Sequence, residues 1–80
     1  MQVPVIKKLV AEYSVEQLSK AEEALLEEQT PEIEVEGNDE GEQLTHVMAA
    51  IWVINHMEKE NIPVGKAVRD YTVKVRNSIS

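Results

Sequence analysis

The sequence contains no cysteine. Disulfide bonds, thiolate zinc sites, iron–sulfur clusters and cysteine nucleophiles are therefore excluded. Glycine is scarce as well, and none of the three glycines is spaced to form a phosphate-binding loop. No serine stands in the strand–turn–helix context of a hydrolase nucleophile. We therefore expect a non-catalytic protein that folds as a single domain over residues 1–80.

Long apolar runs are missing too. The longest uninterrupted run, residues 47–54, is less than half of the ~20 residues that a membrane-spanning helix needs. The N-terminal residues lack the basic and apolar regions of a secretion signal. We expect a soluble, cytoplasmic protein without a membrane partner.

Basic residues are absent from the middle of the chain. Residues 21–58 contain eleven of the fifteen acidic residues and no lysine or arginine, and the net charge is -7. This balance excludes nucleic acid as a partner, because phosphate binding needs a concentrated basic surface. The last part of the chain reverses sign and predicts a basic patch of Lys66, Arg69 and Arg76. We expect the acidic loop to lie near this patch, either in its own chain or in a second copy, and to attract a basic partner protein.

The apolar residues recur with helical spacing along most of the chain. Pro4 suits the first turn of a helix, and Ser14 followed by Gln17 predicts a capping box that opens a second helix. Pro31 ends that helix because proline disfavours helical geometry in the residue before it. Pro63 precedes a last helix whose apolar face extends to Ile79. We predict an all-α fold of four helices, near residues 4–13, 15–30, 42–61 and 64–79.

An acidic extended loop is expected between the second and third helices. Residues 33–36 alternate between apolar and charged with period two, as a short strand would. A lone strand has no hydrogen-bond partner within a helical chain. The segment is therefore expected to be a loop held by Ile33 and Val35, or to pair with its equivalent in a dimer.

The third helix carries apolar residues on two opposite sides. One side holds Leu44, Val47, Met48, Ile51 and Asn55, and the other holds Glu42, His46, Ala50, Val53 and Met57. Trp52 is expected to fill the core. A helix that is apolar nearly all round must be covered nearly all round, and few elements are present to cover it. We therefore predict a homodimer formed through the second side, with the interface residues Ala50, Val53, Met57 and Val73.

A divalent metal is the one cofactor that the sequence points to. Glu42 and His46 are four residues apart on a helix and project in the same direction, and Glu36 and Asp39 precede them. Carboxylate and imidazole ligands together suit zinc, manganese or iron. Alternatively, the acidic residues favour the helix N-terminus electrostatically or bond a free backbone N–H, and His46 is an interface residue.

Three segments carry a resemblance to a known family. They are residues 4–10 (PVIKKLV), 22–28 (EEALLEE) and 39–47 (DEGEQLTHV), and residues 71–79 (YTVKVRNSI) match the family's closing stretch. The chain resembles a family of short acidic bacterial proteins classed as a domain of unknown function. That resemblance implies no activity. We expect a non-catalytic, homo-oligomeric protein–protein interaction module, with divalent-metal binding as the alternative.

Overall fold

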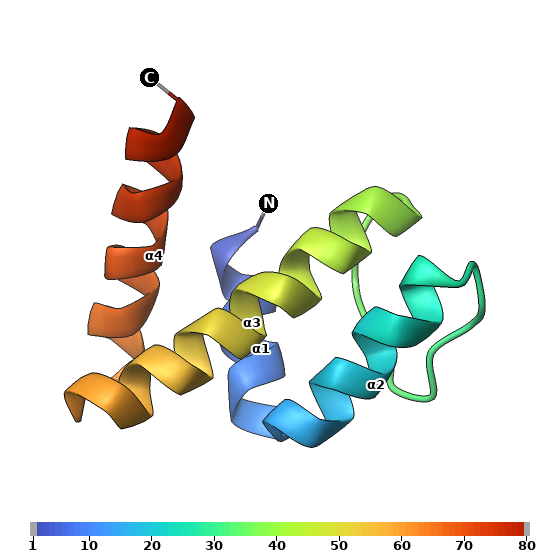
Figure 1. Ribbon diagram of the computed structural model, residues 1–80, viewed down its shortest axis with the longest axis horizontal. Coiled ribbons are helices and arrows are strands. Elements are labelled where there is room, and N and C mark those ends of the chain that lie inside the picture. The colour runs from blue at the N-terminus through green and yellow to red at the C-terminus, as the bar shows by residue number, and fades with distance from the viewer. Residues whose placement is uncertain (1, 80) are drawn as a thin grey trace.

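The computed structural model describes residues 2–79, and the side chains of residues 2–77 (Figure 1). Four helices confirm the all-α prediction: α1 (Val3–Glu12), α2 (Val15–Leu26), α3 (Glu40–Glu60) and α4 (Val64–Ile79). No strand occurs within the described residues. The side chain of Ile79, which was assigned to the apolar face of α4, lies outside this described part.

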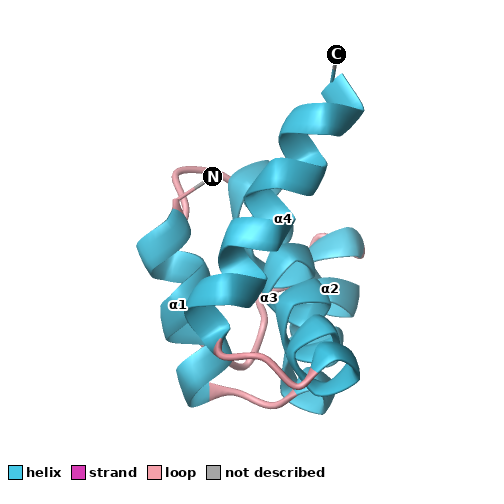
Figure 2. Ribbon diagram, turned by 90° about the vertical axis from the view of Figure 1, so that its left-hand side faces the viewer, coloured by secondary structure: helices cyan, strands magenta, loops and turns pink. Residues whose placement is uncertain are grey.

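The third helix is the centre of the fold. It is about 30 Å long, and α1, α2 and α4 all pack against it. In Figure 1, α1 lies behind α3, α2 runs below it and α4 rises at its C-terminal end. Figure 2 shows the same arrangement from the side of α4, with α1 and α2 on different sides of α3. The chain therefore wraps three helices around one, and they leave part of its surface uncovered.

Side-chain caps set the start of α2 where the sequence predicted it and the start of α3 two residues before the predicted position. The Ser14 hydroxyl accepts from the N–H of Gln17, and the Gln17 side chain accepts from the N–H of Ser14, which completes the capping box. The Asp39 carboxylate accepts from the N–H of Glu42 at 2.7 Å, so α3 begins at Glu40. Both caps satisfy backbone donors that a helix N-terminus leaves unpaired.

The second helix ends four residues earlier than predicted. Glu28 adopts a left-handed conformation (φ 60°), and the N–H of Gln29 donates to the carbonyl of Ala24 at 2.7 Å. The N–H of Glu28 donates to the carbonyl of Leu25, which completes a Schellman motif. Glycine usually occupies the left-handed position of this motif, so a glutamate there gave no sequence signal for the end of the helix.

The core forms between the inner side of α3 and the other three helices. Ile6, Leu18, Val47 and Val53 are fully buried. Ala49 and Ala50 are also fully buried, so the small pair lets helices of the same chain approach closely. The loop between α2 and α3 buries Val35 and half-buries Ile33, which confirms the prediction of a loop held by these two residues.

None of the four helices is long and apolar enough to cross a bilayer, within the residues that the structure describes.

Enlarging Ala50 tests its place in the core. We expect Ala50→Leu to lower the free energy of unfolding by about 1–3 kcal/mol, because three added carbon atoms have no space in a packed interior. The measurement is urea denaturation followed by circular dichroism. The matched control is Ala11→Leu at an exposed position of α1, where stability should hardly change. Equal stability of the two variants would contradict the burial of Ala50.

Candidate functional site

His46 is the one polar side chain that the described part of the fold buries completely. The backbone N–H of Gln2 donates to its Nε2 at 2.9 Å, so Nε2 carries no hydrogen. The proton is therefore on Nδ1, which donates to the carbonyl oxygen of Glu36 at 2.8 Å. Gln2 precedes α1 and has no side-chain cap, so His46 satisfies one of the unpaired donors of that helix. One imidazole thus joins α3 to the start of α1 and to the loop.

The acidic residues near His46 cap backbone groups. The Glu42 carboxylate accepts from the N–H of Asn38 at 2.9 Å, while Asp39 accepts from the N–H of Glu42. The Glu36 carboxylate pairs with Lys8 of α1 at 3.7 Å. Gly37 lets the loop pass close to α3, because an added Cβ would lie 2.8 Å from the Gln43 side chain and 2.9 Å from its backbone nitrogen. The alternative interpretation of these acids as helix-capping groups fits their hydrogen bonds.

The predicted metal ligands are not gathered around one point. Both ring nitrogens of His46 are used in hydrogen bonds to backbone groups, and Glu36 turns toward Lys8. Across the described residues, no three histidine, aspartate or glutamate side chains are arranged to hold a metal ion. Metal binding by Glu36, Asp39, Glu42 and His46 stays a prediction, and it would require His46 to release a backbone partner.

The predicted interface side of α3 contributes to the core of its own chain. Ala50 and Val53, predicted as interface residues, are fully buried within their own chain, so they are corrected to core residues. The other side is divided: Val47 is fully buried in the core, whereas Leu44, Met48, Ile51, Trp52 and Asn55 form a partly exposed row that we call the outward row. These residues lie within about 100° of one another around the helix. Met48 is 51% exposed, and Leu44, Ile51 and Trp52 are half-buried.

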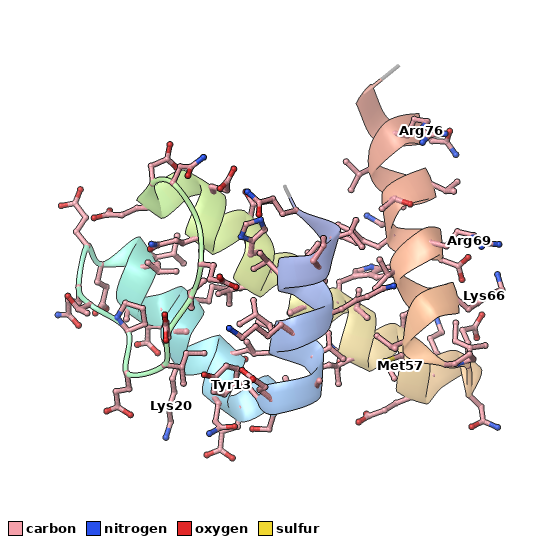
Figure 3. All side chains as sticks on the ribbon, turned by 180° about the vertical axis from the view of Figure 1, so that it is seen from behind. Tyr13, Lys20, Met57, Lys66, Arg69 and Arg76 are labelled. Carbon is pink, nitrogen blue, oxygen red and sulfur yellow. The ribbon has the colours of Figure 1, made fainter. Side chains whose placement is uncertain are left out.

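The two remaining predicted interface residues lie on different surfaces. Met57 is half-buried and, with Tyr13, lines an open hollow of about 490 Å³ between α3 and the corner that joins α1 to α2 (Figure 3). Val73 is 45% exposed on α4. The four residues therefore do not form one surface, and the part that Met57 and Val73 play in an interface stays a prediction.

An aromatic and charged cluster fixes α4 to the end of α3. Trp52 stacks on His56 with ring centroids 4.4 Å apart, and Tyr71 tilts against Trp52 at 5.4 Å. His56 Nε2 donates to the Asp70 carboxylate at 2.9 Å, and Lys66 donates to its other oxygen at 2.9 Å. These bonds, Lys66 first, hold the pKa of Asp70 below its ordinary value of 3.8. Sequence reasoning missed this cluster, although Lys66 and Asp70 have the i, i+4 spacing of a helical ion pair.

The predicted basic patch forms one face of α4. Lys66, Arg69 and Arg76 are exposed and lie within about 80° of one another around the helix, with Val73 among them. Figure 3 shows the three basic side chains along the side of α4 that faces away from the rest of the chain. We call these three residues and Val73 the basic edge.

The acidic residues gather at the opposite end of the molecule. Glu27, Glu28, Glu32, Glu34 and Glu40 are all exposed, and we call them the acidic end. Glu28 and Glu40 line the same open hollow of about 300 Å³. In Figure 1 these segments lie at the right and α4 at the left of the longest dimension, 32 Å. The predicted contact between the acidic loop and the basic patch within one chain is therefore wrong. The same contact with a second copy stays a prediction.

This arrangement defines a small helical protein with an apolar row between two ends of opposite charge. The chain belongs to a family of unknown function (DUF6952), whose model matches residues 1–80. No curated protein matches the chain, and no solved structure matches it either.

Removing the imidazole of His46 tests its role as a structural link. We expect His46→Ala to lower the free energy of unfolding by about 2–4 kcal/mol, because the Gln2 N–H and the Glu36 carbonyl both lose their partner and a cavity forms. Denaturant titrations with and without chelator should give the same loss. A loss that appears only without chelator would instead support the metal prediction. Thr45→Ala, at an exposed neighbouring position of α3, is the control and should change stability less.

The lowered pKa of Asp70 makes part of the stability depend on pH. A carboxylate whose folded-state pKa is depressed stabilises the fold above its ordinary value of 3.8, and this contribution is lost as the pH falls through the lower folded-state pKa. We expect Asp70→Asn to be less stable than wild type at neutral pH, and the difference to narrow below about pH 4. Denaturation midpoints over a pH series measure it. Glu12→Gln, an exposed control, should show no such gap.

Proposed function

We propose that this protein is a non-catalytic protein–protein interaction module that docks its partner on the outward row of α3. One observation carries the proposal: the central helix leaves Met48 exposed and its neighbours in the row, Leu44, Ile51 and Trp52, only half-buried. Contact of these apolar side chains with water is unfavourable. Burying the row against a partner lowers the free energy in proportion to the apolar area that is removed from water.

The row has the composition of an interface centre. Trp52 and Met48 belong to residue types that are enriched at protein interfaces, and tryptophan often contributes much of the binding energy. Polar residues border the row, namely Thr45, Asn55 and Lys59, all of them exposed. The stacking of Trp52 on His56 and its contact with Tyr71 hold the indole in place, so less side-chain entropy is lost on binding.

The charges beside the row restrict the chemistry of the partner. A protein that covers the full length of α3 reaches the acidic end on one side and α4 on the other. The basic partner that the sequence suggested would match the acidic end alone. A partner that matches the whole surface is apolar in the middle and carries charges of opposite sign at its two ends.

Site-specific photocross-linking tests the docking surface. The photoreactive residue benzoylphenylalanine replaces Met48, and the variant is irradiated in the cells that produce the protein naturally. We expect one dominant covalent adduct, identified by mass spectrometry, and its loss when Ile51→Glu places a charge in the row. The control places the same residue at Ala11, on the exposed side of α1, and should give no adduct. Equal labelling at the two positions, or none at position 48, would overturn the proposal.

A further inference from the structure

We infer that the partner on the outward row is a second copy of this chain, packed antiparallel about a twofold axis that crosses α3 between Met48 and Ile51. The inference rests on the proposed function and names its partner. It is carried by the distribution of charge and apolar surface along α3. One symmetric arrangement brings the apolar rows of two copies together and also pairs their opposite charges.

The outward row is self-complementary in the antiparallel direction. With the axis between Met48 and Ile51, each of these residues lies opposite the other in the second copy, so the most exposed apolar side chain of the row meets an apolar partner. A twofold interface uses the same patch on both copies, which means that every favourable contact occurs twice. Two α3 helices that cross at a shallow angle can interdigitate such rows along several turns.

The same axis brings charges of opposite sign together. Glu40 at the start of α3 lies opposite Lys59 near its end, and both are exposed. Antiparallel helices also place the positive end of one macrodipole beside the negative end of the other. Beyond the ends of α3, the acidic end of one copy comes near α4 of the other, which carries four basic residues and one acidic residue. A parallel arrangement would instead place the two acidic ends together.

Each end of the molecule also carries an exposed apolar side chain. Leu26 is 62% exposed beside Glu27, and Val73 is 45% exposed within the basic edge. With Met48, these are the large apolar side chains that the described fold exposes most. They belong to α2, α3 and α4, and Met48 is the one of the three that lies in the outward row.

A stable pair needs to bury only a small share of the surface of one chain. A standard interface buries about 800 Å² per partner. That area is about 15% of the 5296 Å² exposed by one chain. In the plane of Figure 1 the molecule measures 32 by 29 Å. A chain of 80 residues has a small core, and self-association is one of the means by which such chains gain stability.

The first experiment measures mass by sedimentation velocity. We expect wild type at about 100 µM to sediment as a species of twice 9.0 kDa, and Met48→Glu to remain at 9.0 kDa. Ala11→Glu adds the same charge on α1 and should keep the wild-type mass. Circular dichroism confirms that each variant is folded. A dimer that Met48→Glu leaves intact would overturn the inference.

A charge exchange tests the antiparallel direction. One variant carries Glu40→Lys at the start of α3, and the other carries Lys59→Glu near its end. In a dimer of either variant alone, the substituted residue lies opposite a side chain of the same charge in the second copy. We therefore expect the dimer dissociation constant of each variant to rise by about tenfold or more. Mixed in equal amounts, the two variants face opposite charges at both ends and should return to the wild-type mass. A mixture that stays as weak as its components would overturn the antiparallel arrangement.

The two proposals fail in different ways. A wild-type chain that is monomeric in sedimentation, while benzoylphenylalanine at position 48 captures a different identified protein, would overturn the second copy as partner and leave the docking surface supported. A monomeric chain without any adduct at position 48 would overturn both. An adduct of twice the chain mass at position 48, lost in Ile51→Glu, supports both.

Discussion

The structure depends on the burial of one side of α3, with His46 fixed between two backbone groups at its centre. Every other helix packs on α3, so the positions of α1, α2 and α4 all follow from which of its residues are covered. A buried imidazole is tolerated only when its nitrogens are paired, and the Gln2 N–H and the Glu36 carbonyl supply the two partners. His46 thereby fixes the start of α1 and the part of the α2–α3 loop around Glu36.

Local signals were sufficient to predict the helices. Pro4 and the Ser14 capping box act within a few residues of the helix starts that they favour, so their effect is predictable along the chain. The cap at Asp39 is equally local, although α3 was predicted to begin near residue 42. The end of α2 could not be predicted in this way, because its left-handed position holds Glu28 in place of glycine. The choice between the two apolar sides of α3 could not be predicted either. Both sides are apolar, and the fully buried Ala49 and Ala50 admit helices of the same chain as readily as those of a second one.

The candidate site was predictable only where its residues share one helix. Lys66, Arg69 and Arg76 form a face because their spacing places them together, whereas His56 and Asp70 meet across the turn between α3 and α4. Glu36, Asp39 and Glu42 have the residue types and spacing of metal ligands, but carboxylates also bind other groups. Asp39 and Glu42 accept hydrogen bonds from backbone N–H groups, and Glu36 pairs with Lys8. The acidic loop could not reach the basic patch of its own chain, since the length of α3 separates the two ends.

That separation gives α3 its significance for assembly. A rigid helix of about 30 Å holds an acidic group of residues at its start and a basic helix at its end, so the chain cannot neutralise its own charge by bending back. The surface of another molecule can neutralise these charges if it carries basic and acidic groups separated by the same distance. The outward row lies between the two ends and supplies the apolar contact that charge pairs at an exposed surface do not provide by themselves. A second α3 in the opposite direction meets these requirements with the same residues, and the proposed twofold pair rests on this property of one helix.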